Sequence, residues 1–348
     1  MIINSMISSS SGGSASIEAL NVTQNGTYTA SGGVDGYSPV TVNVSGGSDG
    51  SFKAVIERTA TTPTLPSNLT KVGTYAFYRC SDLEITALPI GVTTIENYAF
   101  YDCSKLALSS LPSNLTSIGG YAFYNCKNIT LQNLPASVTT IGNNAFYNCE
   151  KITLTALPSG LTSIGGTTFQ GCYGITLTSL PDTVTSIGGT AFNSCTGITS
   201  ISCNGAITSL GSASFTGSSG HSMAITSVSF PNMAVSSLGN AFGNTAAYAA
   251  CQQLVSADVG KTSTIAGNAF ANCYKLQTLV LRKTGSICTL GNVSAFTNTP
   301  MRGYNSLTGT VYVPSALIAT YKTATNWKTL YDGGTLTFAA IEGSQYAL

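Results

Sequence analysis

The chain has 348 residues, of which only 8% are charged, and 14 basic against 13 acidic residues leave a net charge of +1. Because ordinary soluble domains carry roughly 25% charged residues, this surface must consist mainly of Ser, Thr, Asn and Gly. Without a basic run, binding to nucleic acid or to an anionic membrane surface is disfavoured, and no apolar stretch of about 18 residues predicts insertion into a membrane.

Two segments precede the repetitive part of the chain. Residues 1–16 predict a flexible Ser/Gly-rich leader that lacks the basic and apolar regions of a secretory signal peptide. Residues 17–50 contain three short alternating runs, at 19–22, 27–30 and 40–44, separated by Asn-Gly and Gly-Gly turn signals. We therefore expect a small β attachment segment that ends in a Ser/Gly hinge. We also expect export by a separate route, or release as part of a particle.

The string NGTYTASGGVDGYSPVTVNV, residues 25–44, resembles a short module of phage and prophage structural proteins, especially tail and fibre proteins. The resemblance covers this segment only. It implies that residues 1–50 dock onto other proteins of a virion.

Phenylalanine recurs every 23 residues through the middle of the chain, and six of these residues are followed three positions later by cysteine. A period of roughly 20–29 residues with apolar residues at fixed offsets indicates a leucine-rich-repeat solenoid. A single coil cannot bury its own apolar face, so neighbouring coils must supply the other wall. The residues are Phe77, Phe100, Phe123, Phe146, Phe169, Phe192 and Phe215, with Cys80, Cys103, Cys126, Cys149, Cys172 and Cys195.

Each coil is expected to contain two extended pieces and a turn. Ile129–Leu134 predicts a first strand that Pro135 ends, and Val138–Ile141 predicts a second. Gly142 is expected to free the chain to turn, and the AFYNC segment to form a single 3₁₀ or α turn that points Phe and Cys inward. Register-equivalent cysteines favour a file of buried thiols over disulfides, and no CxxC or His-rich tract supports a zinc site.

The full motif, L/V-T-x-I/V-G-x-x-A-F-x-x-C-x-x-L/I-x-L-x-x-L-P, resembles the BspA-like, or Treponema-type, leucine-rich repeats over residues 63–300. The resemblance implies a mainly β solenoid of 23-residue coils with short strands, at residues 51–300, and a role in surface adhesion and recognition. Phe52–Arg58 is expected to form the first strand of an N-terminal cap, because an open end coil would expose its apolar face.

After Phe215 the phenylalanine spacing lengthens, at Phe242, Phe270 and Phe296. Insertions in repeats map to loops, and Thr216–Met223 and Thr245–Gln253 are therefore candidate binding loops.

Residues 301–348 leave the repeat and predict a C-terminal cap. The pattern indicates a strand at Thr310–Val313, Pro314 as a helix-start signal and a helix at Ser315–Thr323. The string YVPSALIATYKTATNW resembles the terminal cap of BspA-like domains. The side chains expected to cover the last coil are Leu317, Tyr321 and Trp327.

No pattern of catalytic residues stands out. The single histidine, His221, lies in a Gly/Ser-rich loop without a positioned acid, and Glu96 and Asp102, which share one coil, are expected to be solvated. No glycine-rich phosphate loop follows a strand. We therefore predict no enzyme activity, no cofactor and no metal site.

Seven tyrosines form the candidate ligand-binding surface. At 23-residue spacing they predict two parallel columns, which would either stack only to stabilise the solenoid or bind a protein or a glycan. In later coils the equivalent sites are Gln170, Asn193 and Thr216, and Asn144, Thr167 and Thr190. The tyrosines are Tyr75, Tyr78, Tyr98, Tyr101, Tyr121, Tyr124 and Tyr147.

The sequence therefore predicts a non-enzymatic binding or structural protein. The first hypothesis is a bacteriophage fibre or decoration protein, assembled in the host cytoplasm and oligomeric like most fibres. Its residues 1–50 would contact other virion proteins, and its solenoid would contact a host surface protein or glycan. The alternative hypothesis is a bacterial cell-surface adhesin.

Overall fold

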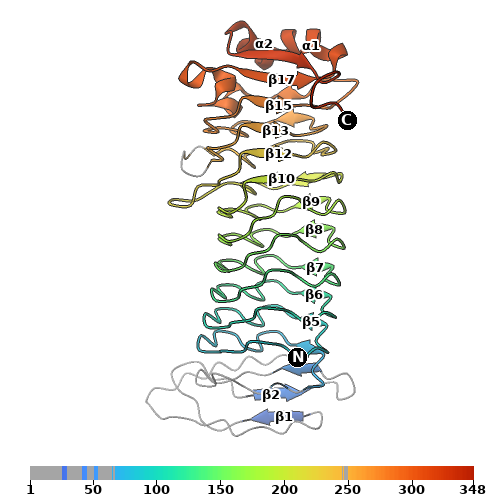
Figure 1. The fold of residues 1–348 in the computed structure, drawn as a ribbon, viewed down its shortest axis with the longest axis vertical. Helices are drawn as coiled ribbons and strands as arrows, with labels where there is room; N and C mark the ends of the chain where they lie inside the picture. Colours follow the sequence, from blue (N-terminus) through green and yellow to red (C-terminus); the bar gives the residue numbers. More distant parts are fainter. Residues whose placement is uncertain are drawn as a thin grey trace. The chain divides into compact units, whose positions relative to one another are not determined.

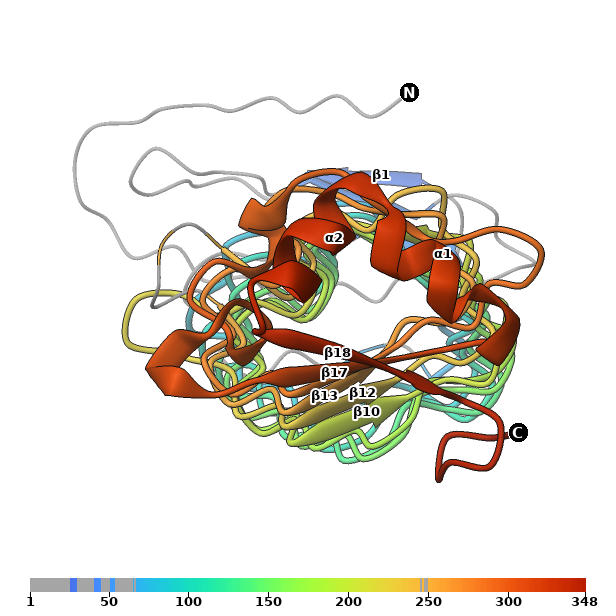
Figure 2. The same ribbon diagram turned by 90° about the horizontal axis from the view of Figure 1, so that it is seen from above.

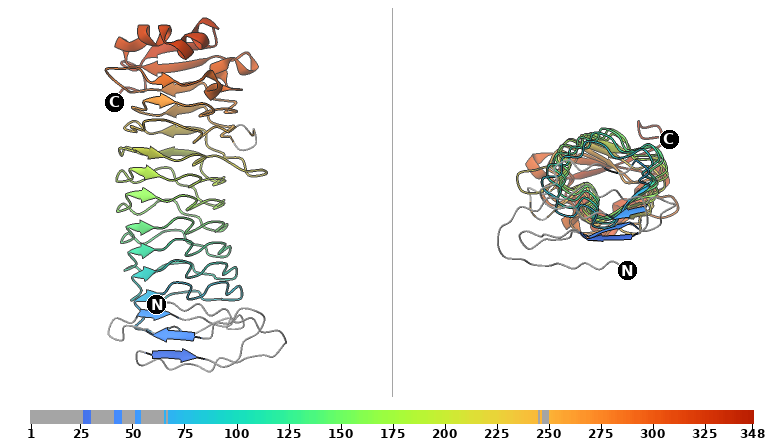
Figure 3. Two further views of the ribbon diagram at one scale, coloured as in Figure 1. Left: turned by 180° about the vertical axis from the view of Figure 1, so that it is seen from behind. Right: turned by 90° about the horizontal axis from the view of Figure 1, so that it is seen from below.

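The computed structural model describes residues 26–29, 41–44, 51–53, 65, 67–244, 246 and 250–348. The chain divides into two compact units, Met1–Ile152 and Thr153–Leu348. Each unit is a β-solenoid in which short strands of successive coils pair in parallel, as Figures 1 and 3 show. The leader at residues 1–16 lies outside the described residues. The mainly β solenoid fold is confirmed.

The described residues of the first unit form one sheet with the strand order β1-β2-β3-β4-β5-β6-β7. β1, β2 and β3 pair antiparallel, and from β3 onward each strand pairs in parallel with that of the next coil. The expected runs near 27–30 and 40–44 are confirmed as β1 and β2, whereas 19–22 and most of Phe52–Arg58 lie outside the described residues. The strands are β1 (Gly26–Thr29), β2 (Thr41–Val44), β3 (Ser51–Lys53), β4 (Lys71–Val72), β5 (Thr94–Ile95), β6 (Ser117–Ile118) and β7 (Thr140–Ile141).

In the second unit, the described residues form three parallel sheets, ordered β11-β9-β8, β14-β16 and β10-β12-β13-β15-β17-β18. Seen from above, α1 and α2 lie on the side of the last coil opposite β17 and β18 (Figure 2). The strands are β8 (Ser163–Ile164), β9 (Ser186–Ile187), β10 (Ser200–Ser202), β11 (Ser209–Leu210), β12 (Ser227–Ser229), β13 (Ser256–Asp258), β14 (Thr264–Ile265), β15 (Thr278–Val280), β16 (Thr289–Leu290), β17 (Gly309–Val313) and β18 (Leu336–Ala340). The helices are η2 (Val293–Phe296), η3 (Pro300–Arg302), η4 (Tyr304–Ser306), η5 (Ser315–Leu317), α1 (Ile318–Thr323) and α2 (Thr325–Asp332).

The prediction of a strand at Ile129–Leu134 is wrong, because this segment has no regular secondary structure. Its last two buried residues, Leu131 and Leu134, are three positions apart, whereas a strand turns every second side chain to the same face. Strands occupy this side of the coil only from β10 onward, where the buried residues are two apart, as at Ile201 and Cys203. The second predicted piece, Val138–Ile141, is confirmed by β7.

The AFYNC segment is a series of linked β-turns rather than one helical turn. The backbone N–H groups of Ala145, Tyr147 and Cys149 each donate to the carbonyl three residues earlier, over 3.3, 3.2 and 3.1 Å. Two residues here, Asn144 and Asn148, take left-handed backbone angles, with φ of 59° and 53°. Asparagine tolerates this conformation better than most residues, so the two asparagines allow the chain to turn in this coil.

Gly142 has a different role from the expected one. It is not among the glycines with positive φ, and a Cβ at this position would collide with the backbone of Gly120 in the preceding coil. Glycine is therefore required for the close approach of two coils and not for the freedom to turn.

The core of each unit is a single file of stacked phenylalanine rings. In the first unit the ring centroids of Phe77, Phe100, Phe123 and Phe146 are 5.0, 5.3 and 5.3 Å apart, with the planes within 9° of parallel. In the second unit six rings form the same arrangement at 5.3 to 5.8 Å. All of these side chains are fully buried. Each ring therefore closes the layer of the coil before it, as the spacing predicts.

The cysteines form a second internal file. All ten are free and buried. The thiols of Cys103 and Cys126 each donate to the backbone carbonyl of the phenylalanine one coil earlier, Phe77 and Phe100, over 2.9 Å. Burial raises the pKa of both thiols well above the ordinary value of 9.0. The predicted thiol file is thus also a set of hydrogen bonds between coils.

The C-terminal cap closes the phenylalanine file of the second unit. Trp327 lies 5.9 Å from Phe296 and donates its Nε1–H to the carbonyl of Cys288 over 2.8 Å. The Tyr321 hydroxyl accepts the backbone N–H of Cys288 over 2.8 Å. The predicted strand is confirmed as β17, and the predicted helix is confirmed as η5 and α1. Leu317 is only half-buried, whereas Tyr321 and Trp327 are fully buried.

We expect stability to decrease above the ordinary pKa of a thiol. The raised pKa keeps each thiol neutral in the folded chain, whereas an unfolded thiol ionises near pH 9. The contribution to folding is therefore complete below pH 9 and is lost as the pH rises toward the folded-state pKa. Urea unfolding at several pH values measures this. Cys103→Ala with Cys126→Ala should give a shallower decline, and an equal decline in both proteins would contradict the assignment.

A second prediction concerns two hydroxyls at one register position. The residue before the ladder phenylalanine is alanine in most coils, but it is Thr168 or Ser214 in two of them. Thr168 donates to the carbonyl of Gly165 over 2.9 Å, whereas the buried Ser214 hydroxyl has no hydrogen-bond partner among the described residues. Ser214→Ala should raise the free energy of unfolding by about 1 kcal/mol, and Thr168→Ala should lower it by about 1–2 kcal/mol. Denaturant midpoints of both variants test the contrast, and destabilisation by Ser214→Ala would refute it.

Candidate functional site

The seven predicted tyrosines lie in two stacked columns of the first unit, here called the tyrosine surface. Column A consists of Tyr75, Tyr98 and Tyr121, with ring centroids 4.9 and 4.8 Å apart. Column B is formed by Tyr78, Tyr101, Tyr124 and Tyr147, with centroids 4.9, 4.6 and 4.4 Å apart. The columns contact each other, since the Tyr98 and Tyr101 centroids are 5.8 Å apart. All seven side chains are half-buried.

Stacking decides which parts of these rings can meet a ligand. Tyr98, Tyr101 and Tyr124 each have a parallel neighbour on both faces. Sugar binding on aromatic residues commonly uses an open ring face, and these three rings offer none. Their edges and hydroxyl groups remain, and a phenol hydroxyl both donates and accepts hydrogen bonds.

Column A occupies an unfavourable backbone position. Tyr75, Tyr98 and Tyr121 have φ of 60°, 58° and 57°, in the left-handed region, which costs an L-residue other than glycine or asparagine about 1–2 kcal/mol. Asn144 occupies the equivalent position in the next coil. Aromatic stacking, at about 0.5–1.5 kcal/mol per pair, offsets much of this cost. The coil therefore folds without tyrosine at this position.

A file of polar side chains borders column B. Arg79 lies 3.6 Å from the Asp102 carboxylate, and its guanidinium is 5.7 Å from the centre of the Tyr78 ring. Asn125 donates its Nδ2–H to Asp102 Oδ1 over 2.7 Å, and Asn148 donates in the same way to Asn125 over 3.1 Å. Phenol edges and amide groups therefore lie side by side on this surface.

Burial raises the pKa of three phenol groups of the tyrosine surface. It raises the pKa of Tyr124 to about 12, and the neighbouring Tyr147 and Tyr101 add to this. Burial is also the main cause of the raised pKa values of Tyr98 and Tyr101. A smaller contribution comes from the negative charge of neighbouring groups, Tyr121 for Tyr98 and Asp102 for Tyr101. These three phenols are thus neutral hydrogen-bond donors at physiological pH.

The register equivalents in the second unit are polar. Thr167 and Thr190 lie with their hydroxyl oxygens 3.2 Å apart, and Asn193 donates its Nδ2–H to the Thr216 hydroxyl over 2.9 Å. These side chains bond to one another, so the second unit has no continuation of the aromatic columns at these positions.

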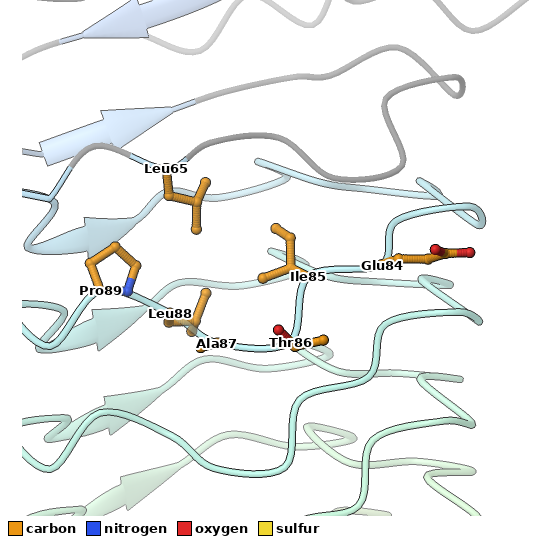
Figure 4. A pocket seen from close by; sticks show the side chains of 7 residues that line it. All are labelled: Leu65, Glu84, Ile85, Thr86, Ala87, Leu88 and Pro89. Carbon is orange, nitrogen blue, oxygen red and sulfur yellow. The ribbon is translucent and has the colours of Figure 1, made fainter.

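A hollow of about 380 Å³ lies in the first unit, lined by apolar side chains (Figure 4). Leu65 and Ile85 point into it, whereas the Glu84 carboxylate points away. Among the described residues that line the hollow, Glu84 is the only ionisable one. The lining residues are Leu65, Glu84, Ile85, Thr86, Ala87, Leu88 and Pro89.

The acidic residues considered for chemistry are engaged in ion pairs. Glu96 lies 3.1 Å from Lys71 and accepts two hydrogen bonds from Thr74. Burial opposes ionisation of Glu96, but the hydrogen bonds from Thr74 and Lys71 outweigh it, so its pKa lies below the ordinary value. Asp102 contacts Arg79 and Asn125. Glu96 therefore lacks the raised pKa of a general acid, and the Asp102 carboxylate is held in contacts of its own.

His221 lies at the tip of the inserted loop Thr216–Met223, where Ser218 and His221 exchange backbone hydrogen bonds of 3.2 and 2.9 Å. Its ring stacks on Tyr173 at 4.4 Å. Thr245–Gln253, the second predicted loop, falls partly outside the described residues. No group of three or more His, Cys, Asp or Glu side chains in the described part could hold a metal ion, and no helix there is long and apolar enough to span a membrane.

Two features of the second unit escaped the sequence analysis. Asp258 and Arg282 form a nearly buried ion pair, with Oδ2 and Nη2 2.7 Å apart. Tyr274 stacks on Tyr304 at 5.0 Å. Both pairs join coils of altered length, where constant spacing no longer identifies neighbours. The sequence did contain one signal for the ion pair. Asp258 stands where the preceding strand has Ser229, and a charged residue is unusual in a chain with so few charges.

The repeats match a family model described as the BspA type leucine rich repeat region, in six copies over residues 49–153 and 162–302. None of the curated proteins matches the chain. Among solved structures, a leucine-rich repeat protein from Bacteroides ovatus is 22% identical, covering 81% of this chain and 84% of that one, with a TM-score of 0.41. A leucine rich cell surface protein from Faecalibacterium prausnitzii is 21% identical over 70% of this chain and 83% of its own, with a TM-score of 0.33. The T. pallidum leucine rich repeat protein is 26% identical over 42% and 81%, with a TM-score of 0.33.

Titration of the tyrosines tests the packing of this surface. The absorbance of tyrosinate is measured against pH for the unchanged protein and for Tyr124→Phe, and the difference between the two curves is the titration of Tyr124. This residue should ionise well above the ordinary pKa of 10.0. The same subtraction in a Tyr147→Phe background should give a lower pKa, because one neighbour that raises it is removed. Ionisation of Tyr124 at its ordinary pKa would contradict the stacked arrangement.

Proposed function

Because the chain belongs to the BspA type leucine rich repeat family, we propose that it is a non-enzymatic recognition protein that binds its partner through the tyrosine surface. One observation carries the proposal. Three consecutive coils place a bulky tyrosine in a left-handed position that the following coil fills with Asn144. Folding of the coil does not require this residue type, so binding accounts for it better than stability does.

The chemistry of the surface favours a neutral ligand rich in hydrogen-bonding groups. The phenol hydroxyls are uncharged, the adjoining file ends in the amides of Asn125 and Asn148, and the nearby charges are paired. A host surface protein or an uncharged glycan fits this chemistry. Because the inner ring faces are covered, the contact is made through ring edges and hydroxyls rather than by stacking.

We further propose that the protein is part of a bacteriophage particle, as a fibre or decoration subunit that docks through residues 1–50. The resemblance of residues 25–44 to a module of tail and fibre proteins supports this assignment. The presence of the chain in purified particles would support it. Exclusive recovery from the bacterial envelope would instead support the second candidate, a cell-surface adhesin, which the family favours.

Removal of hydroxyl groups tests the binding surface. Tyr101→Phe with Tyr124→Phe keeps the stacked rings but removes two hydroxyls, each worth about 0.5–1.5 kcal/mol. Affinity for host cells, or for a glycan identified on an array, should fall about tenfold or more. Tyr274→Phe with Tyr304→Phe makes the same change in a stacked pair of the second unit and should have no effect.

Both double variants should unfold at the same denaturant concentration as the parent. If all three proteins bind equally, or if the parent binds neither cells nor glycans, the tyrosine surface is not the binding site.

A further inference from the structure

The last strand of the second unit has one unpaired edge. β18 is the terminal strand of the six-stranded sheet and pairs with β17 alone among the described residues. The N–H of Gly309 donates to the Thr335 carbonyl, and that of Ile341 donates to the Val313 carbonyl, both over 3.0 Å. These bonds show that Thr335 and Ile341, together with the alternate residues between them, turn their backbone groups toward β17.

The remaining residues of β18 must therefore turn their backbone groups away from the sheet, because alternate residues of a strand address opposite edges. These residues are Leu336, Phe338 and Ala340. No described residue bonds to their N–H or carbonyl groups. Figure 2 looks onto this end of the unit, and no helix crosses β18 there.

This edge lacks the usual protection against pairing. Natural edge strands carry charges, proline or bulges that prevent contact with another chain. Residues 335–341, TLTFAAI, contain no charge, proline or glycine, and the register with β17 is continuous over five residues.

The C-terminal tail does not cover the edge. Tyr346 packs on Tyr312 of β17, with ring centroids 4.7 Å apart. The Glu342 carboxylate accepts the N–H of Ser315 over 2.9 Å. Through these contacts the tail lies against β17 and η5 rather than along the open edge of β18.

The edge also presents apolar surface. Phe338 packs against Tyr321, Trp327 and Tyr331, with ring centroids 5.4 to 5.9 Å apart, and yet it remains half-exposed. A partner that continued the sheet would cover the remaining ring surface together with the open backbone groups.

We propose that β18 pairs antiparallel with β18 of a second copy of this chain, about a two-fold axis at Phe338. The strand is complementary to itself in this register. Phe338 would face Phe338 of the second copy, and Leu336 would face its Ala340. Each such pair exchanges two backbone hydrogen bonds. A two-fold interface needs no second sequence, and the absence of charge removes any repulsion between the copies.

Engineered disulfides test the register. In the proposed register, Thr337 of one copy would lie opposite Ala339 of the other. The two residues would form a non-hydrogen-bonded pair with Cα atoms about 4.5 Å apart, which is close enough for a disulfide. The full chain with Thr337→Cys and Ala339→Cys should therefore form a covalent dimer under mild oxidation. Each single variant is the matched control, because its new cysteine faces a residue without a thiol, and it should stay uncrosslinked. The ten native cysteines are buried and contribute no background.

Oligomeric state tests the interface without a crosslink. Analytical ultracentrifugation of the unchanged full chain should show a dimer. Ala340→Pro removes an outward N–H and should raise the dissociation constant at least tenfold, with the thermal unfolding temperature retained. Ala347→Pro, which places proline in the tail and removes the N–H that donates to the Ser344 carbonyl, should leave the dimer intact. A monomeric parent chain, a dimer unaffected by Ala340→Pro, or equal crosslinking of single and double variants would overturn the proposal.

Discussion

The structure depends on identical side chains lying over one another in successive coils. A phenylalanine ring covers the ring of the preceding coil, and a cysteine thiol bonds back to the carbonyl of that earlier phenylalanine. Both contacts fail if one coil shifts by a residue, since the ring and the thiol would then meet the wrong layer. The close approach of Gly142 to the Gly120 backbone sets the same requirement from the main chain. Packing therefore fixes the register of each coil on the next, whereas the longer coils after Phe215 keep the same file of rings despite their extra residues.

Because the core provides most of the stability, side chains on the outer surface contribute little to it. Four of the ion pairs join neighbouring coils through partly exposed groups, as at Lys105 and Asp82, and such pairs contribute little stability. The tyrosine columns differ from this background because they combine stacked aromatic rings with phenol hydroxyls, and because column A also occupies an unfavourable backbone position. That combination is the reason for assigning recognition to them.

The two ends of a solenoid pose a different problem from its middle, because an end coil has a neighbour on one side only. In the second unit, Trp327 covers the last phenylalanine of the file, Phe296, and Trp327 and Tyr321 together satisfy both backbone groups of Cys288. The interior is thus closed, but the edge of β18 is not. Side chains can fill a core, whereas only another strand can satisfy a row of backbone groups in the same plane.

The sequence by itself determined the repeat length, the two internal files, the two tyrosine columns and the cap residues Tyr321 and Trp327. It could do so because stacking converts a constant spacing along the chain directly into contact between coils. The tertiary structure alone decided that Ile129–Leu134 is not a strand, that the inner tyrosine faces are covered, that Asp258 meets Arg282 and that β18 has an open edge. The first two depend on backbone angles and ring orientations, which spacing does not specify, and the last two on pairing between coils of unequal length, where spacing no longer identifies the neighbour.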